Sequence, residues 1–202
     1  MFLWWFLSVF SVVSLMRVFL ALTLPDEVRR SLSLFQRELA HAGADIKWVE
    51  RQHLHVTLKF LGEVTDEQRR VVEQRLGEVA RGETAFALGL DRVGAFPSLS
   101  SPRVVWFGLG EGKARAVRLA ERLEQDCVGL GLRKEERPFA AHVTLGRVRS
   151  PRGLGALARA LQTNDWTPPA LWTVTAVTLY QSVLSSGGPT YNVLMEIPLK
   201  SP

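Results

Sequence analysis

Two copies of one tetrapeptide, His55-Val-Thr-Leu58 and His142-Val-Thr-Leu145, organise this chain. Each copy lies in a stretch rich in β-branched residues that predicts a strand, with segments of helical periodicity on both sides. A duplication that produces two similar lobes would give this repeat. Side chains at positions i and i+2 of a strand share a face, so each histidine points the same way as the threonine that follows it.

The paired histidines and threonines have the chemistry of a phosphoryl-transfer site. If the two strands lie side by side, or are related by a pseudo-twofold axis, His55 and His142 converge on one cleft together with Thr57 and Thr144. One imidazole would take a proton from the attacking oxygen and the other would give one to the leaving oxygen. An unperturbed pKa of about 6.5 allows both protonation states near neutrality. The threonine hydroxyls can donate to non-bridging phosphate oxygens. This chemistry requires no metal, and we expect no cofactor.

The repetition makes the signal specific. A single His-x-Thr is common in exposed strands and predicts little. The chain has four histidines, and the odds that two of them precede a threonine by two places by chance are about a few per cent.

The other segments predict an α+β fold, because strands and helices are mixed without the strict alternation of a parallel sheet. We expect a bilobal protein with two pseudo-symmetric antiparallel sheets and flanking helices around a central cleft. Amphipathic periodicity and capping signals predict helices that begin at Pro25-Asp26, after Thr65, at Lys113 and at Pro151. The expected apolar faces are Val28, Leu32, Phe35 and Leu39 in the first helix and Val71, Val72, Leu76 and Val79 in the second. The expected strands are Arg17–Leu24, Ile46–Val49, Leu54–Leu61, Phe86–Val93, Val104–Leu109, His142–Val148, Thr173–Leu184 and Tyr191–Leu199, with a Ser- and Pro-rich loop at Gly94–Pro102 and a turn at Ser185–Pro189.

Residues 1–15, MFLWWFLSVFSVVSL, differ from the rest because they carry no charge. They lack the basic start and cleavage site of a secretory signal, and they are shorter than the roughly 20 apolar residues of a spanning helix. We expect an N-terminal extension upstream of a true start at Met16, followed by a single bilobal domain over residues 16–202. A membrane anchor and a hydrophobic arm packed on the body are the alternatives, and we expect no stable membrane association.

Composition narrows the class of protein. The 202 residues are 47% apolar and 22% charged, an ordinary globular balance that excludes a disordered chain, a collagen-like repeat and a coiled coil. Cys127 is the single cysteine, which excludes an intrachain disulfide and a four-cysteine zinc site, so we expect a cytoplasmic protein. The net charge of +5 and a pI of about 9.9 favour an anionic partner such as RNA or phosphate.

Several stretches resemble one family, the 2H phosphoesterases, and within it the bacterial and archaeal RNA 2′,3′-cyclic phosphodiesterases, also called 2′-5′ RNA ligases. The resemblance runs from Met16 to about Leu199. The matching stretches are Met16-Arg-Val-Phe-Leu-Ala-Leu22, Lys47-Trp-Val49, Leu54-His-Val-Thr-Leu-Lys-Phe-Leu-Gly-Glu63, Gly94-Ala-Phe-Pro97, Arg103-Val-Val-Trp106, Arg137-Pro-Phe139, His142-Val-Thr-Leu-Gly-Arg147, Val177-Thr-Leu-Tyr-Gln-Ser182 and Gly188-Pro-Thr-Tyr191.

The resemblance implies hydrolysis of an RNA-terminal 2′,3′-cyclic phosphate to a 2′-phosphomonoester. It also implies ATP-independent 2′-5′ joining, the same displacement run backwards with a 5′-hydroxyl. By analogy His55 is the acid that protonates the departing 3′-oxygen and His142 is the base that activates water, although the two roles could be exchanged. The expected partners are RNA ends, tRNA fragments among them, and we expect a monomer.

Further residues are candidates for binding. The resemblance places a phosphate-contacting arginine at Arg147, and strand parity puts Lys59 on the face of His55. Phe60 and Phe139 could stack a nucleobase, although core packing is the plainer interpretation. Four arginines near the matched stretches could follow an RNA backbone or be ordinary rim charges: Arg103, Arg137, Arg149 and Arg152.

The remaining polar candidates do not build a second site. His53 lies two residues before His55, but no cysteine or carboxylate at suitable spacing completes a zinc site, so we expect no metal. His41 fits the C-terminus of the first helix, where a positive charge is favourable. Ser182 has no base partner visible in the sequence.

Two other functions stay open at this point. One is a 2H enzyme that acts on a small cyclic nucleotide or an ADP-ribose cyclic phosphate. The other is a non-catalytic RNA-binding module, against which the retention of two titratable imidazoles argues.

Overall fold

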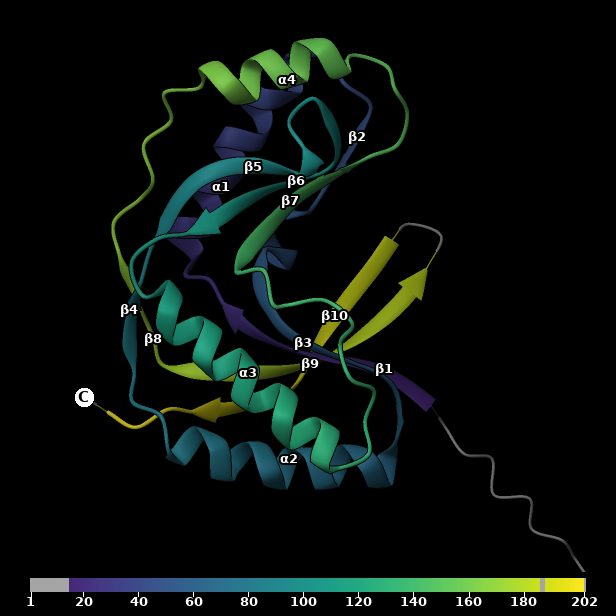
Figure 1. Ribbon diagram of the computed structural model, residues 1–202, viewed down its shortest axis with the longest axis vertical. Coiled ribbons are helices and arrows are strands. Elements are labelled where there is room, and N and C mark those ends of the chain that lie inside the picture. Colours follow the sequence, from purple (N-terminus) through teal and green to yellow (C-terminus); the bar gives the residue numbers. More distant parts are fainter. Residues whose placement is uncertain (1–14, 186–187, 202) are drawn as a thin grey trace, which may run out of the picture.

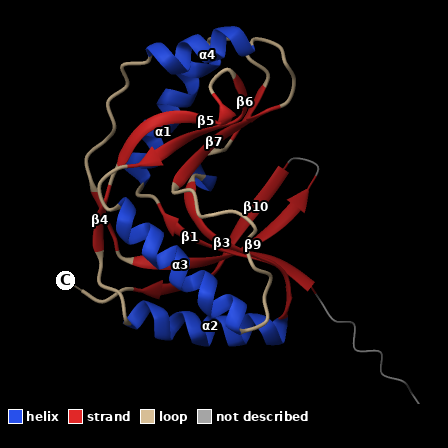
Figure 2. Ribbon diagram, in the orientation of Figure 1, coloured by secondary structure: helices blue, strands red, loops and turns tan. Residues whose placement is uncertain are grey.

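Two four-stranded antiparallel sheets form the centres of two lobes in the computed structural model (Figures 1 and 2). The structure describes residues 15–185 and 188–201, so the predicted extension, apart from Leu15, lies outside the described residues. The first sheet has the strand order β10-β9-β1-β3 and the second the order β2-β7-β6-β5. In chain order the elements are β1 Leu15–Thr23, α1 Asp26–Ala40, β2 Ile46–Trp48, the 3-10 helix η1 Arg51–His53, β3 His55–Thr65, α2 Asp66–Arg81, β4 Phe86–Leu88, β5 Leu90–Ser98, β6 Ser101–Leu109, α3 Lys113–Gly129, β7 His142–Val148, α4 Leu154–Thr163, β8 Trp172–Val174, β9 Ala176–Ser185 and β10 Gly188–Pro198.

The chain passes between the lobes several times, and the short β4-β8 pair lies along one of these passages (Figure 1). Strands β1 and β3 pair in the first sheet, whereas the helix α1 and the strand β2 that lie between them in the chain belong to the second lobe. The Phe35 ring of α1 meets the Phe107 ring of β6 at 5.5 Å between centroids. In the same way β6 and β7 pair in the second sheet, although α3, which follows β6, packs against β3 in the first. Each of these two helices therefore packs on the sheet to which the strand before it does not belong.

Apolar periodicity explains why these helices pack as they do. The predicted face of α1 is buried, with Val28, Leu32, Phe35 and Leu39 each at most 3% exposed. In α3 the buried positions fall at the same spacing, at Ala116, Ala120, Leu123 and Cys127. A face that removes several large side chains from water supplies most of the stability of a helix in a folded protein.

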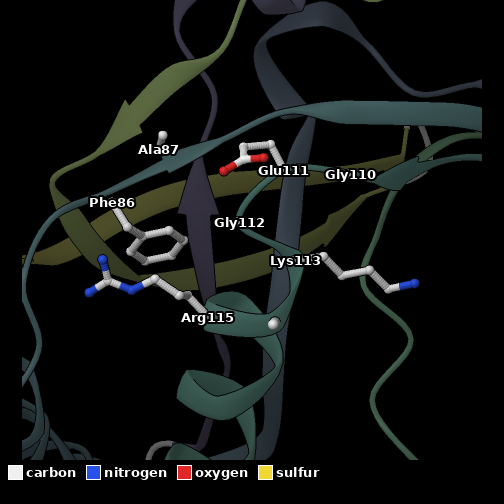
Figure 3. A pocket seen from close by; sticks show the side chains of 8 residues that line it. Phe86, Ala87, Gly110, Glu111, Gly112, Lys113 and Arg115 are labelled. Carbon is white, nitrogen blue, oxygen red and sulfur yellow. The ribbon is translucent and has the colours of Figure 1, made fainter.

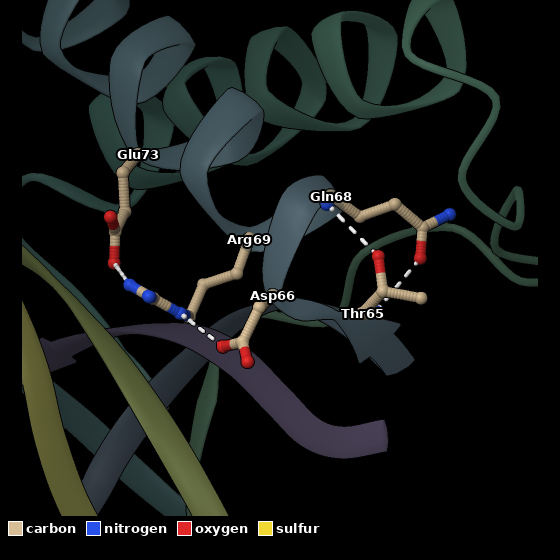
Figure 4. A network of polar contacts seen from close by, with 5 residues as sticks. All are labelled: Thr65, Asp66, Gln68, Arg69 and Glu73. Atoms are coloured by element: carbon tan, nitrogen blue, oxygen red, sulfur yellow. Dashed lines mark hydrogen bonds and ion pairs between the residues drawn. The ribbon is translucent and has the colours of Figure 1, made fainter. Parts of the chain in front are cut away.

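A capping box starts α2, as the sequence predicts (Figure 4). The Gln68 backbone N–H donates to the Thr65 hydroxyl at 3.1 Å, and the Thr65 N–H donates to the Gln68 side chain at 3.0 Å. Beside the box, Arg69 forms ion pairs with Asp66 and Glu73. The box satisfies backbone donors that would otherwise have no partner at this helix end.

A bulge interrupts the ladder at the same place in both central strands. In β3, Thr57 pairs with Ala21 and Lys59 with Leu20, so Leu58 is the extra residue. In β7, Thr144 pairs with Trp106 and Gly146 with Val105, so Leu145 is extra. A bulge adds one residue to one strand and reverses the facing of every residue beyond it.

The structure corrects several local predictions. The strands expected at Phe86–Val93 and Thr173–Leu184 are each divided in two, into β4 and β5 and into β8 and β9. Gly94–Pro102 is not a loop, because β5 and β6 continue through it as a hairpin that ends at the Ser98 and Ser101 pair. Val71, expected on the inner face of α2, is 44% exposed. Helix α4 begins at Leu154, three residues after Pro151, since Pro151 to Gly153 form a turn. Within the described ranges, no helix is long and apolar enough to span a membrane.

Candidate active site

The two His-x-Thr segments meet where the sheets face one another, because β3 and β7 are in contact (Figure 1). His55 and His142 each begin their strand. The imidazoles lie close enough for the charge of His142 to lower the pKa of His55. The structure therefore brings together the four residues of the repeated motif, with one histidine and one threonine supplied by each sheet.

Matching hydrogen bonds orient the two imidazoles. In His55, Nδ1 lies 2.7 Å from the His53 carbonyl and Nε2 lies 2.8 Å from the Thr57 hydroxyl. In His142, Nδ1 lies 2.6 Å from the Ala140 carbonyl and Nε2 lies 3.3 Å from the Thr144 hydroxyl. A carbonyl only accepts, so Nδ1 carries the proton and Nε2 is the nitrogen available for proton transfer.

Burial weakens the basicity of both imidazoles. Desolvation is the main cause that lowers the pKa of His55 to about 4, and the nearby charges of His53 and His142 lower it further. Desolvation also lowers the pKa of His142, with a contribution from the positive charge of Arg147. Both rings are therefore neutral at pH 7 in the free protein, and a bound anion would raise both pKa values.

Aromatic rings surround His55 on the first sheet. Phe19 lies 5.0 Å from the imidazole between ring centroids, and Tyr191 meets it edge-on at 5.4 Å. Tyr180 stacks on Phe19 at 5.2 Å and shares a 3.0 Å hydrogen bond with the Thr23 hydroxyl. These rings exclude water from one side of the imidazole, which explains its desolvation.

Phe96 and Trp106 flank His142 on the second sheet, at 5.2 and 6.2 Å between ring centroids. The Trp106 ring lies across Gly94, where a Cβ atom would clash with the ring. Sequence reasoning gave no role to Tyr191, Phe96 or Trp106. The signal available for them was their position in the matched stretches. Trp106 and Phe96 lie on β6 and β5 beside the His142 strand, and Tyr191 lies on β10 at the far edge of the His55 sheet.

The bulge in β7 brings Arg147 to the face of His142. Strict alternation would put Gly146 on that face and turn Arg147 away, but the extra Leu145 reverses the order. Arg147 is exposed, and its charge lowers the pKa of His142 and acts on Tyr191 of the other sheet. The arginine thus lies near both halves of the site.

The same bulge in β3 makes the prediction for Lys59 wrong. Its side chain turns into the protein and is 1% exposed, where Nζ donates to the Arg133 carbonyl at 2.7 Å and forms an ion pair with Glu124 at 2.6 Å. Lys59 therefore does not line the face of His55. Phe60 occupies that face instead, 58% exposed and 5.9 Å from the Phe19 ring.

The other candidates lie around this centre. Phe139 is half-buried and packs against the core rather than on either imidazole. His53 meets the Tyr191 ring at 4.8 Å, and its carbonyl orients His55. His41 is exposed at the end of α1. In the part of the chain that the structure describes, no group of three metal-ligating side chains comes together.

A surface hollow of about 560 Å³ lies away from the histidines, at the start of α3 (Figure 3). Phe86, Glu111, Lys113 and Arg115 line it, and the Arg115 guanidinium lies over the Phe86 ring at 4.9 Å. Arg115 also donates to the Thr84 and Ala85 carbonyls, so its guanidinium already has partners within the protein. None of the motif residues faces this hollow.

Two antiparallel sheets that each present a histidine and a threonine define a two-histidine phosphoesterase of α+β class. The family model described as LigT like phosphoesterase matches residues 22–106 and 109–191, and each matched segment contains one His-x-Thr. The chain belongs to this family.

Proteins from several organisms are similar to the chain along most of its length. An RNA 2′,3′-cyclic phosphodiesterase of Archaeoglobus fulgidus is 36% identical over 180 residues, which are 89% of this chain and 98% of the relative. One of Aeropyrum pernix is 34% identical over 170 residues, 84% of this chain and 96% of the relative. The crystal structure of E. coli LigT complexed with 3′-AMP superposes with a TM-score of 0.74 at 29% identity and covers 92% of this chain and 99% of its own. These matches bear out the predicted fold class and family.

Proposed function

We propose that the protein is an RNA 2′,3′-cyclic phosphodiesterase that hydrolyses the cyclic phosphate at an RNA end to a 2′-phosphomonoester. The observation that carries the proposal is the pair of imidazoles, each held through Nδ1 by a backbone carbonyl and each with a threonine hydroxyl beside Nε2. The names of the relatives from Archaeoglobus fulgidus and Aeropyrum pernix support the same activity.

In the reaction proposed by analogy with the family, His142 is the base and His55 is the acid, and the two roles can be exchanged because each histidine serves both directions of the displacement. Nε2 of His142 takes a proton from water, and the water oxygen forms a new bond to phosphorus. The bond from phosphorus to the 3′-oxygen breaks, and Nε2 of protonated His55 gives its proton to that oxygen. The products are a 2′-phosphomonoester and a free 3′-hydroxyl. Ligation would be the same displacement with an RNA 5′-hydroxyl in place of water: the 5′-oxygen bonds to phosphorus, the bond to the 3′-oxygen breaks, that oxygen takes the proton, and a 2′-5′ bond is the product.

The neighbouring groups have proposed roles in binding. Thr57 and Thr144 donate to non-bridging phosphate oxygens, which gain charge in the transition state. Arg147 attracts the phosphate. The negative charge of the bound phosphate then offsets the effect of Arg147 on the pKa of His142. Phe60 is exposed on the same face and is available to stack a base. For Phe139, packing against the core is the better supported role.

The wider proposals follow from the chemistry of an RNA end. The partners are RNA ends, tRNA fragments among them, and the protein acts as a monomer in the cytoplasm without a cofactor. Residues 16–202 are proposed to form one bilobal domain, and residues 1–15 to be an extension that catalysis does not need. A chain that starts at Met16 should keep full activity on the same RNA.

The test is an RNA that ends in a 2′,3′-cyclic phosphate, with the product end identified as a 2′- or 3′-phosphate. We expect a 2′-phosphate, no loss of rate in EDTA, and faster turnover of an oligonucleotide end than of a mononucleotide 2′,3′-cyclic phosphate. A 3′-phosphate product, or strict dependence on a divalent metal, would contradict the mechanism.

Substitution of either histidine should remove activity without removing binding. We expect His55→Ala and His142→Ala to lower kcat by at least about 10³-fold, since proton transfer by a positioned side chain contributes up to about 10⁴-fold. RNA affinity should change little, because the phosphate and base contacts remain. His41→Ala is the matched control, since His41 is exposed at the end of α1, and it should keep the parental rate. Full activity in either motif variant would refute the mechanism.

A further inference from the structure

A buried ion pair outside the motif joins the strand of one histidine to the approach of the other. Lys59 lies in β3, at the bulge that follows His55 and Thr57, and is 2% exposed. Its Nζ contacts Glu124 Oε2 of α3 at 2.6 Å and donates to the Arg133 carbonyl at 2.7 Å. The other Glu124 oxygen accepts from the Glu135 backbone N–H at 2.8 Å.

The segment held by this pair leads directly to His142. Residues 130–141 contain no helix or strand and, apart from Leu132, are largely exposed. Their end sets the second imidazole, because the Ala140 carbonyl accepts from His142 Nδ1 at 2.6 Å. The ion pair therefore connects the strand of His55 to the segment whose Ala140 carbonyl orients His142.

A second contact connects the strand of His142 to the segment before His55. Gln36 of α1 is 6% exposed, and its Nε2 donates to the Leu145 carbonyl at 2.8 Å and to the Val49 carbonyl at 2.9 Å. Leu145 is the bulge residue of the His142 strand, and Val49 lies between β2 and His55. This contact ties the strand of His142 to the chain that leads to His55.

The two contacts occupy equivalent places in the two halves. Gln36 follows buried Phe35 in α1 as Glu124 follows buried Leu123 in α3. Each helix residue reaches the bulge after one motif and the segment before the other. We call Lys59 with Glu124 the ionic tie, and Gln36 with its two carbonyls the amide tie.

Stability does not explain the ionic tie. A buried ammonium costs several kcal/mol to desolvate, and apolar residues of similar volume often replace a buried pair without loss of stability. What the pair adds is a fixed position for two backbone groups of a segment that has no regular structure. A displacement of about 1 Å at a reacting group can lower a rate by about 10²-fold.

We propose that Lys59, Glu124 and Gln36 are positioning residues whose reciprocal ties set the separation of the two imidazoles for in-line displacement. This inference rests on the proposed function, because two histidines must act on one phosphorus atom. The ties touch neither substrate nor imidazole, so their removal should act on kcat through geometry and leave the binding contacts in place.

The test uses Lys59→Met/Glu124→Leu, which replaces the ionic tie by apolar side chains, and Gln36→Leu, which removes the amide tie. We expect each to lower kcat 10- to 100-fold with KM changed less than threefold. Amide exchange at Glu135 should accelerate at least tenfold in the first variant. Glu121→Gln on α3 and Arg37→Gln on α1, both exposed on the same helices, are the controls and should match the parent.

A readout that does not need turnover separates this proposal from the proposed function. Inorganic phosphate should shift the NMR signals of both imidazole rings in the parent, and in the tie variants the shift of at least one ring should fall by half or more. If the parent does not cleave the cyclic phosphate, the proposed function fails while the phosphate and exchange measurements still test the ties. A folded tie variant with accelerated Glu135 exchange and a kcat within twofold of the parent would overturn the proposal. If the double variant does not fold, Glu124→Gln is judged by the same criteria, with an expected fall in kcat of at least threefold.

Discussion

At the scale of single residues, the position of each imidazole decides when it holds a proton. His55 is enclosed by Phe19 and Tyr191, and this burial lowers its pKa to about 4. The pKa of His142 falls below its ordinary value for the same reason, with Arg147 as a further cause. The mechanism needs one ring protonated and the other neutral, so the free enzyme holds the required single proton only over a limited pH range. In that range His55, whose pKa is the lower, is the neutral ring and His142 is the protonated one. The proton order of the free enzyme therefore matches the exchanged roles, and His55 acts as the acid only in the minor form that carries the proton on its ring.

We therefore predict an acid optimum for kcat/KM, which reports the pKa values of the free enzyme. Below about pH 4 both rings are protonated and the base is lost, whereas above the pKa of His142 both are neutral and the acid is lost. The rate should peak between pH 4 and 6.5 and fall about tenfold per unit on the alkaline side. An initial-rate profile with an RNA cyclic phosphate measures this, because the diester itself does not titrate in that range. A plateau that extends above pH 8 would contradict the lowered pKa values.

The alternation of side chains along a strand correctly predicted the facing of the residues before the bulge in β3 and wrongly predicted the facing of Lys59 beyond it. The i, i+2 rule correctly placed His55 with Thr57, since no irregularity lies between them. It misplaced Lys59, because an extra residue in a ladder depends on the partner strand and on the polar groups that bind the freed backbone. The contacts of Glu124 and Gln36 with the bulges come from helices distant in sequence, and no local pattern shows them.

At the scale of elements, local sequence patterns predicted where helices form more accurately than they predicted where strands end. The buried face of α1 and the capping box of α2 depend on residues within a few positions of each other, so periodicity and spacing are sufficient. The hairpin of β5 and β6 was predicted as a loop because Ser and Pro dominate its tip. Pairing between neighbouring strands overrides that composition, and a single sequence does not show which strands pair.

The capping box of α2 allows a prediction about stability alone. Thr65→Ala removes the oxygen that accepts from the Gln68 N–H and should lower the free energy of unfolding by about 1 kcal/mol. Thr65→Ser keeps the hydroxyl and should lose much less. Urea unfolding measures both variants, and kcat/KM should stay at the parental value, since the cap lies at the far end of β3 from His55. An equal loss in the two variants would show that the methyl group, rather than the cap, is what matters.

At the scale of the whole molecule, the exchanged helices make the two lobes depend on each other. Helix α1 buries Phe35 against the second sheet, although the strand before it, β1, belongs to the first. Helix α3 packs against β3, although β6 and β7 belong to the second sheet. Unfolding of one lobe would strip a helix from the other, so partial unfolding exposes apolar surface in both lobes.

We predict that both lobes unfold in one transition. Cys127 reports on α3 and the first sheet, because it is 2% exposed and burial raises the pKa of its thiol to about 11. Trp166, which contacts Phe35 and Phe107, reports on the second lobe. Thiol labelling and the emission of a variant that keeps Trp166 as its single tryptophan should give the same urea midpoint. Midpoints that differ by more than about 0.5 M would indicate two independent units.

The exchange of α1 and α3 also bears on how two non-equivalent histidines can arise in a doubled chain. Two identical halves that traded their first helices would form a symmetric dimer, with interchangeable imidazoles and no distinction between attacking and departing oxygen. In the present chain that equivalence is broken at the bulges. When the two motifs are aligned, Lys59 corresponds to Gly146 and Phe60 corresponds to Arg147. Because both halves belong to one polypeptide, corresponding positions can carry different side chains, here an exposed arginine in one half and an exposed phenylalanine in the other.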